Sequence, residues 1–159
     1  MRICFVCQGN IIRSPLAENL FRRLSQQQGV EGKYQLDSAG TSAYHVGEGP
    51  DRRMRQTARE RGFQYDGRAR QFKPVELDQF DLIIAMDKAN RRILESWVTD
   101  EAQRGKIRLM REFDPQGGVD LDVPDPYYGG PEGFARTYEI VERSVEGLLE
   151  ALESGTLTP

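Results

Sequence analysis

Short apolar segments and longer periodic ones alternate along the chain, and this alternation predicts the order of strands and helices. Strands are expected at residues 3–6, 34–38, 82–86 and 107–110. The third of these is apolar at every position, which is typical of a strand in a parallel sheet that is covered by helices on both faces.

Apolar residues at helical spacing predict a helix after each strand. The first has Ser14 as its N-cap and Pro15 as its first helical residue, and the second spans residues 50–62. Asp87 caps the third, and the last follows a long loop, residues 114–131. The residues expected on the buried faces are Leu16, Ala17, Leu20, Phe21 and Leu24 in the first helix, Met54 and Ala58 in the second, Ile93, Leu94, Trp97 and Val98 in the third, and Phe134, Tyr138, Val141, Val145, Leu148 and Leu152 in the last.

This order predicts an α/β fold with a four-stranded parallel sheet, right-handed crossovers and helices on both faces. We expect residues 1–159 to form a single domain, because no internal repeat, low-complexity tract or linker interrupts the sequence. Ligands of such sheets bind outside the carboxyl ends of the strands, so the loops that follow the strands are the expected place of the functional site.

Composition and charge exclude several classes of protein. Hydrophobic residues make up 38% of the chain and charged residues 30%, with a net charge of −3, which lacks the positive excess of a protein that coats nucleic acid. No apolar run approaches the roughly 20 residues that cross a bilayer. The apolar start of the chain ends at Gln8, too early for a signal peptide. We therefore expect a cytoplasmic protein that binds neither nucleic acid nor membranes.

The two cysteines, Cys4 and Cys7, have the C-x-x-C spacing of redox and zinc sites, but neither interpretation fits. Three residues of a strand span about 10 Å, more than the ~7 Å that a disulfide allows between Cα atoms. Zinc needs four ligands, and the chain has a single histidine, His45. We expect no metal site, and we expect Cys4 to be a small buried hydrophobe.

Cys7 opens the segment CQGNIIRS, residues 7–14, which joins the first predicted strand to the first helix. Backbone N–H groups at such a turn form a cradle for anions, and Gly9 and Asn10 tolerate the left-handed backbone that a cradle can need. Arg13 adds a charged fork that fits two phosphate oxygens. In this field we expect Cys7 to be a thiolate, the form that attacks phosphorus. From the residues alone, a buried Cys7 beside an exposed Arg13 explains the pattern equally well.

Residues 7–15 resemble the signature of the low-molecular-weight protein tyrosine phosphatases. Further matches follow in the family's order and cover nearly the whole chain: DSAGTS at 37–42, ARQ at 69–71, AMD at 85–87 and DPYYG at 125–129. The resemblance implies an enzyme that hydrolyses phosphotyrosine through a phosphocysteine intermediate on Cys7, without a cofactor or metal. The implied partner is a phosphotyrosine-containing protein, such as a tyrosine kinase or its target, and the enzyme itself is expected to be a monomer.

The resemblance also implies roles for individual residues. Arg13 clamps the phosphate, Asp125 serves as general acid and then base, and Ser14 hydrogen-bonds the thiolate. The remaining positions are Gln8, Gly9, Asn10, Ile11, Ile12, Tyr44 and Tyr127, which bind the phosphate or form the pocket, and Ser38, which braces the loop with Asn10. We expect His45 at the pocket rim. Without the resemblance, Asp125 is more simply a turn residue, and the two tyrosines are partly exposed aromatics.

Two positions depart from the family's pattern. Ile12 stands where the family often has a second cysteine that traps the oxidised nucleophile as a disulfide, so we expect peroxide to drive Cys7 to irreversible acids. Gly67 stands where a histidine often joins the bracing network, which puts the support of Asn10 and Ser38 in question.

Three alternative functions remain. An arsenate reductase would need an external thiol, because no cysteine follows Cys7. A phosphoarginine phosphatase is similar but has threonine where Ile11 stands. A phosphate-binding module without catalysis would not require Cys7, Arg13 and Asp125 together.

Overall fold

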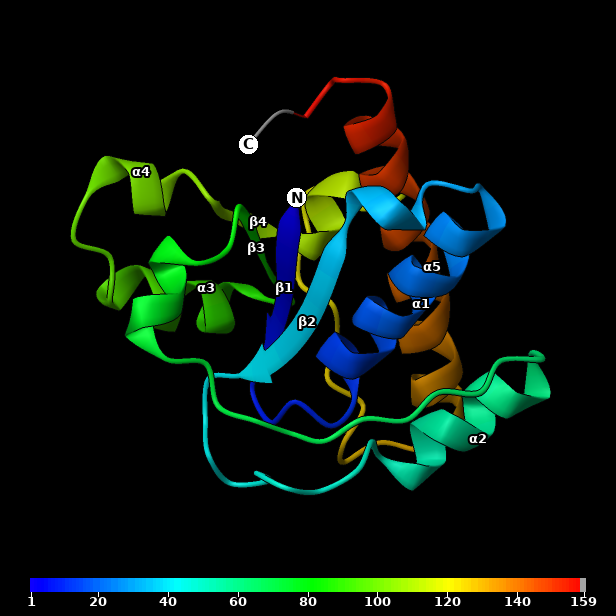
Figure 1. The fold of residues 1–159 in the computed structure, drawn as a ribbon. Helices are drawn as coiled ribbons and strands as arrows, with labels where there is room; N and C mark the ends of the chain where they lie inside the picture. Colours follow the sequence, from blue (N-terminus) through cyan, green and yellow to red (C-terminus); the bar gives the residue numbers. More distant parts are fainter. Residues whose placement is uncertain (158–159) are drawn as a thin grey trace.

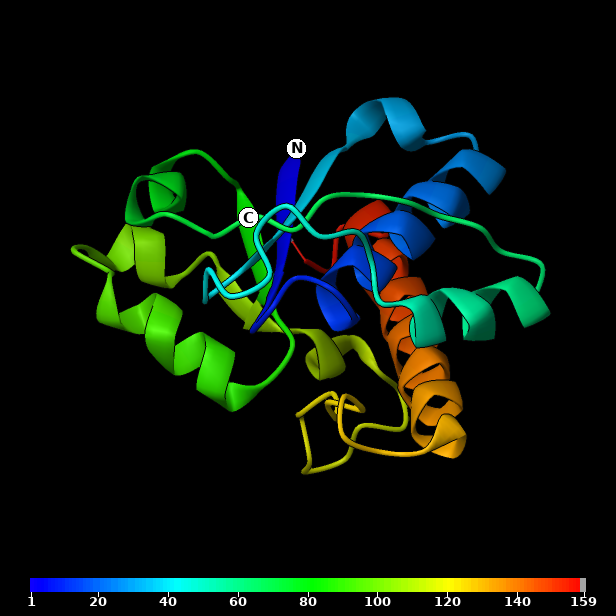
Figure 2. The ribbon, with the colours of Figure 1, turned by 90° about the horizontal axis from the view of Figure 1, so that it is seen from below.

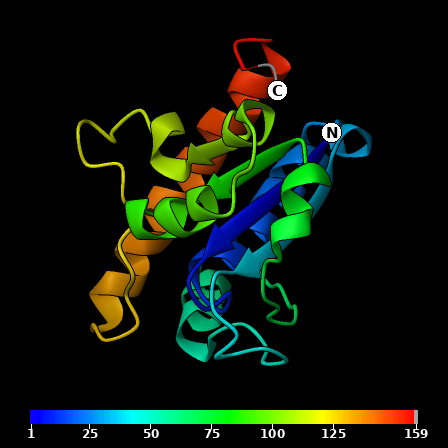
Figure 3. The ribbon, with the colours of Figure 1, turned by 90° about the vertical axis from the view of Figure 1, so that its left-hand side faces the viewer.

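The computed structural model describes residues 1–157 and contains a four-stranded, all-parallel sheet (Figure 1). Its strands are β1 (Arg2–Cys7), β2 (Gln35–Gly40), β3 (Leu82–Ala85) and β4 (Ile107–Leu109), in the spatial order β2-β1-β3-β4. All four point toward the same edge of the sheet (Figure 3). The predicted fold class is confirmed.

Helices cover both faces of the sheet (Figure 2). On one face lie α1 (Arg13–Gln27) and α5 (Pro131–Glu153), and α2 (Arg52–Glu60) packs against α5 on the same side. On the other lie α3 (Lys88–Ser96) and α4 (Glu101–Arg104). Three short 3-10 helices, Glu31–Lys33, Pro74–Asp78 and Met110–Phe113, complete the described elements. No helix within residues 1–157 is both long enough and apolar enough to traverse a bilayer.

Side chains of β1 alternate between two hydrophobic cores, as the period of a strand requires. Phe5 and Cys7 belong to the core under α1 and α5, whereas Cys4 and Val6 belong to the core on the α3 side. The two thiols therefore lie on opposite faces of one strand, and both are free. Cys4 is fully buried, as expected of a small hydrophobe.

Several expectations about the helices are wrong. α1 begins at Arg13, with Ile12 before it, so Ser14 does not cap the helix and Pro15 is its third residue, not its first. Its hydroxyl is turned toward the Cys7 sulfur instead. Ile93 is 41% exposed, because only one side of the nine-residue helix α3 meets the sheet and Leu94 occupies it. Trp97 and Val98 follow the end of α3 at Ser96 and are only partly buried against the same core.

The parallel register brings several loops to one edge. Cys7 is paired with Gly40 at the ends of β1 and β2. At the end of β3, Met86 donates its N–H to Val6 and accepts a hydrogen bond from the N–H of Val123, each 2.8–2.9 Å long. Residues 8–12, 41–51 and 114–130 therefore converge where a sheet of this type binds its ligands.

Candidate active site

The loop after β1 wraps around the sulfur of Cys7. The Asn10 N–H donates to Cys7 Sγ over 3.3 Å, and Ser14 Oγ lies 3.0 Å from the same sulfur. Asn10 has a φ of 56°, which confirms the left-handed backbone expected there. Gly9 does not use the left-handed backbone that it tolerates, but its lack of a side chain avoids a close contact: a Cβ at Gly9 would lie 2.9 Å from Cδ2 of His45.

The side chain of Asn10 braces this loop from behind. Its Nδ2 donates to Ser14 Oγ (2.8 Å) and to Ser38 Oγ (3.0 Å), and its Oδ1 accepts from the backbone N–H of Arg70 (3.0 Å). Ser38 Oγ in turn donates to Glu18 Oε1 over 2.7 Å. Glu18 and Arg70 thus complete a network that does not need a side chain at position 67.

Arg13 is 2% exposed, so it is not the exposed helical arginine of the alternative interpretation. Its Nη1 donates to Asp87 Oδ2 (2.7 Å) and to the carbonyl of Val123 (3.0 Å). Its Nη2 lies 3.6 Å from Asp125 Oδ2. Burial opposes the charge of Arg13, but the negative charges of Cys7 and Asp87 outweigh it and raise the pKa of the guanidinium.

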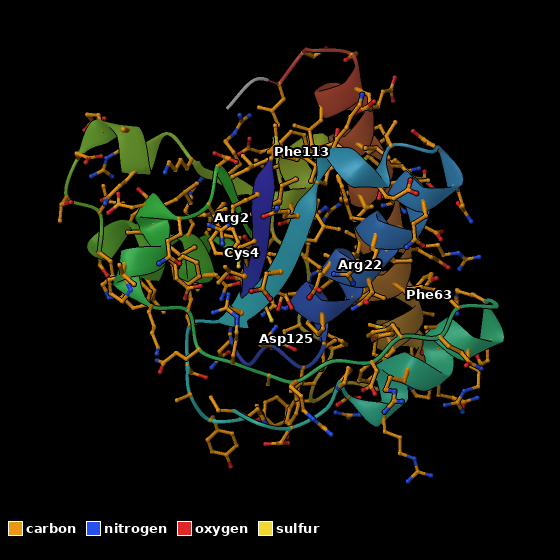
Figure 4. The ribbon with its side chains drawn as sticks, in the orientation of Figure 1. Arg2, Cys4, Arg22, Phe63, Phe113 and Asp125 are labelled. Carbon is orange, nitrogen blue, oxygen red and sulfur yellow. The ribbon has the colours of Figure 1, made fainter. Side chains whose placement is uncertain are left out.

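The loop that carries Asp125 is anchored at several points. The Val123 N–H bonds to the carbonyl of Met86, and Thr137 Oγ1 donates to the carbonyl of Pro124 (3.1 Å). Asp125 Oδ1 accepts from the N–H of Tyr127 (3.1 Å), while its side chain remains 42% exposed. Figure 4 shows Asp125 just beyond the carboxyl end of β1. The carboxylate is therefore held at the mouth of the site, within reach of both Arg13 and solvent.

A pocket of about 510 Å³ joins these groups. Of the residues expected at the site, it is lined by Cys7, Gln8, Gly9, Ile11, Ile12, Arg13, Tyr44, Asp125 and Tyr127, whereas Asn10, Ser14 and Ser38 lie behind the loop. His45 also lines the pocket, and its ring packs 4.7 Å from the ring of Tyr44 and 6.1 Å from that of Tyr127. Tyr44 itself is 84% exposed.

Several residues of the site were not found from the sequence. Ser42 and Tyr128 line the pocket, and Glu18 and Asp87 act on its loop and its arginine. Ser42, Tyr128 and Asp87 lie within the matched segments DSAGTS, DPYYG and AMD, which gave no role for them at the pocket, and Glu18 lies outside every match. Asp87 was predicted only as a helix cap, and the sequence around it does not indicate its bond to Arg13.

The fold and the loop together define a class: α/β proteins whose first strand ends in a cysteine-containing anion cradle closed by an arginine. Within it, the family model described as "Low molecular weight phosphotyrosine protein phosphatase" matches residues 2–156, and the chain belongs to this family.

Individual relatives agree with this assignment. The chain is 44% identical over 152 residues to the low molecular weight protein-tyrosine-phosphatase of Streptomyces coelicolor, which covers 95% of this chain and 93% of that protein. A crystal structure of the protein tyrosine phosphatase of Entamoeba histolytica superposes with a TM-score of 0.92 at 40% identity and 99% coverage of both chains. The Drosophila arginine phosphatase DARP superposes with a TM-score of 0.87 at 29% identity, covering 96% and 98%.

Proposed function

We propose that this protein hydrolyses phosphotyrosine in proteins, with Cys7 as nucleophile, Arg13 as phosphate clamp and Asp125 as general acid and base. The observation that carries the proposal is the shared pocket, in which the sulfur of Cys7, the guanidinium of Arg13 and the carboxyl of Asp125 face one space. No single one of these groups would define the chemistry.

The first step transfers the phosphoryl group to sulfur. The Cys7 thiolate attacks phosphorus, the bond from phosphorus to the phenolic oxygen breaks, and Asp125 gives its proton to that oxygen. Arg13 and the loop N–H groups hold the equatorial oxygens as charge develops.

The second step releases phosphate. Water attacks the phosphocysteine, Asp125 accepts its proton, and the sulfur leaves as a thiolate. The hydroxyl of Ser14, 3.0 Å from the sulfur, supports the leaving group.

Two features favour phosphotyrosine over the alternatives. Ile11 and the ring of Tyr127 form apolar pocket walls suited to an aromatic group. The arginine phosphatase DARP is less similar to this chain, at 29% identity, than the tyrosine phosphatases at 40% and 44%. Arsenate reduction within one chain would need further cysteines beyond Cys7.

Initial rates with aryl phosphates in the presence of EDTA test the proposal. Wild type should hydrolyse them, Cys7→Ser should abolish turnover, and Cys4→Ala should leave it unchanged. Asp125→Ala should slow the hydrolysis of phenyl phosphate by about 10²–10⁴-fold. It should slow the hydrolysis of p-nitrophenyl phosphate less, because a good leaving group needs no proton. Asp120→Ala, in the same loop, is the matched control. Metal dependence, or faster hydrolysis of a phosphoarginine peptide than of its phosphotyrosine equivalent, would contradict the assignment.

We also propose that the enzyme acts in the cytoplasm as a monomer of one domain, on a phosphotyrosine-containing protein such as a tyrosine kinase or its target. Light scattering and capture of phosphoproteins by Asp125→Ala are the direct measurements. A stable dimer, or capture of no phosphotyrosine protein, would overturn this part of the proposal.

A further inference from the structure

A second hollow opens directly beside the active-site pocket. It has a volume of about 580 Å³ and shares Ile11, His45 and Tyr127 with the pocket. These three residues form a common rim, so a peptide whose phosphotyrosine enters the pocket must lay neighbouring residues along or over the rim. The second hollow is therefore placed to contact the substrate beside its phosphotyrosine.

Four arginines line this hollow, which we call the arginine groove: Arg52, Arg53, Arg55 and Arg68. Two carboxylates, those of Glu48 and Asp51, line it as well. The first three come from the first turns of α2, and Arg68 comes from the connection that follows this helix. The connection before α2 and the connection after it are held together by two backbone hydrogen bonds. The Gly47 N–H donates to the Ala69 carbonyl over 2.9 Å, and the Ala69 N–H donates to the Glu48 carbonyl over 2.8 Å. In Figure 1 these connections run beneath the sheet and lead into and out of α2.

The four arginines outnumber the two carboxylates of the groove, and Glu48 is turned to His45 (Oε2 to Nδ1, 2.8 Å) and not to an arginine. Arg53 is paired with Asp51 (Nη2 to Oδ2, 3.0 Å) and donates to the carbonyl of Tyr127, so it is engaged within the protein. Within residues 1–157, Arg52, Arg55 and Arg68 form no ion pair with a carboxylate. The chain as a whole carries a net charge of −3, so this local positive excess runs against the overall balance.

We propose that the arginine groove binds an anionic group of the substrate that neighbours the phosphotyrosine, either a carboxylate or a second phosphate. The inference rests on the proposed function and specifies its substrate class: acidic or multiply phosphorylated tyrosine segments. Guanidinium forks match both anions with paired hydrogen bonds, and an uncompensated positive surface beside a pocket also steers anionic substrates toward it. Nucleic acid fits less well, because it requires a longer basic surface than three arginines on an acidic chain.

Three phosphotyrosyl peptides of one sequence test the groove: one with neutral flanks, one with Asp and Glu flanks, and one with a second phosphotyrosine. Wild type should show a kcat/KM about tenfold higher for at least one anionic peptide than for the neutral one, and added salt should reduce this ratio. The triple variant Arg52→Gln/Arg55→Gln/Arg68→Gln should lower the ratio to near one. Glutamine preserves helix propensity, so α2 should remain folded.

Arg59→Gln is the matched control, since Arg59 is an exposed arginine of α2 that does not line the groove. It should keep the full ratio. Binding of the same labelled peptides to Cys7→Ser, with and without the three groove substitutions, gives a readout that does not depend on turnover. Single Arg68→Gln, outside the helix, serves if the triple variant does not fold.

The outcomes separate the two proposals. Hydrolysis of all three peptides at equal kcat/KM overturns the arginine groove and leaves the phosphatase intact. If wild type hydrolyses none of them, the proposed function fails, and equal binding to Cys7→Ser would overturn the groove as well. Tighter binding of a single-stranded oligonucleotide than of either anionic peptide, lost in the triple variant, would assign the groove to nucleic acid instead.

Discussion

The carboxylate of Asp87 joins the phosphate clamp to the start of a helix. Its Oδ2 accepts a hydrogen bond from Arg13 Nη1 at 2.7 Å, and its Oδ1 accepts from the N–H of Asn90, also at 2.7 Å. One residue thus caps α3 and fixes the buried guanidinium. The orientation of Arg13 is set by the opposite face of the sheet, through an element that does not touch the pocket.

Asp87→Asn separates these two functions. Asparagine caps helices about as well as aspartate, but its side chain has only one oxygen. When that oxygen accepts from the N–H of Asn90, the NH2 group of the asparagine faces Arg13 and cannot accept the hydrogen bond of the guanidinium. A hydrogen bond to a charged group contributes about 1.5–3 kcal/mol, so kcat/KM for an aryl phosphate should fall by roughly tenfold or more. Asp100→Asn, the equivalent cap of α4 that binds Gln103 N–H, should leave the rate unchanged. Equal rates in both variants would show that Arg13 is positioned without Asp87.

Local patterns were sufficient for much of the fold. The alternation of strands and helices, the position of Cys7 at a strand end and the left-handed Asn10 all follow from neighbouring residues. The partner of Arg13 could not be predicted in this way, because Asp87 is 74 residues away and acts through the sheet. Glu18 was missed because it has the pattern of an exposed helical residue, and it does pair with Arg22 one turn later.

The incorrect prediction of Ser14 as an N-cap shows the same limit of local sequence patterns. Ser14 has the residue type and position of an N-cap, but its hydroxyl is taken by Cys7 and Asn10. A competing partner supplied by the folded loop outweighs the local preference, and this competition is not visible in the sequence around Ser14.

Gly147 of α5 is required by a close approach of the chain. A Cβ at this position would lie 1.9 Å from the carbonyl oxygen of Phe113, which is backbone and cannot rotate away. Gly147→Ala should therefore lower the free energy of unfolding by about 3 kcal/mol or more, because α5 must shift. Gly133→Ala in the same helix meets only Pro126 Cβ at 3.6 Å, an ordinary contact, and should be neutral or stabilising. Urea denaturation of both variants measures the difference, and equal stabilities would contradict the close approach.

Oxidation of Cys7 should be irreversible in the wild type. Ile12, which lines the pocket with Cys7, offers no thiol, and Cys4 lies on the opposite face of β1. Excess peroxide should convert the sulfenic acid to sulfinic acid, and dithiothreitol should not restore activity. In Ile12→Cys the sulfenic acid should condense with the new thiol, releasing water, and dithiothreitol should then restore most of the activity. Cys4→Ala should behave as wild type. Full recovery of the wild type would reveal a protective route that does not use a second cysteine.

A buried ion cluster supports the loop that carries Asp125 and makes a prediction about pH. Asp114 Oδ1 accepts from Arg143 Nε at 3.1 Å, and its Oδ2 accepts from Arg111 Nε at 3.2 Å. Arg111 also donates to the carbonyl of Asp122, which lies shortly before Asp125 in the loop. Burial opposes the charge of Asp114, but hydrogen bonds and the positive charges of the two arginines outweigh it and lower the pKa of Asp114.

Since the folded-state pKa is below the unfolded value of about 3.9, the ionised Asp114 stabilises the protein above that pH and loses this effect as pH falls through the folded-state pKa. Asp114→Asn should therefore be about 3 kcal/mol less stable than wild type at pH 7, since it leaves two arginines without their partner. The difference should shrink as the pH is lowered from about 5 toward 2, because wild type then loses the same charge. Asp120→Asn, whose exposed carboxylate is 3.9 Å from Arg111, should change stability by less than about 1 kcal/mol. Urea denaturation across this pH range measures the free energy of unfolding of both variants. If Asp114→Asn stays less stable than wild type by the same amount down to pH 2, the packing of the Asp114 side chain, and not its charge, holds the loop in place.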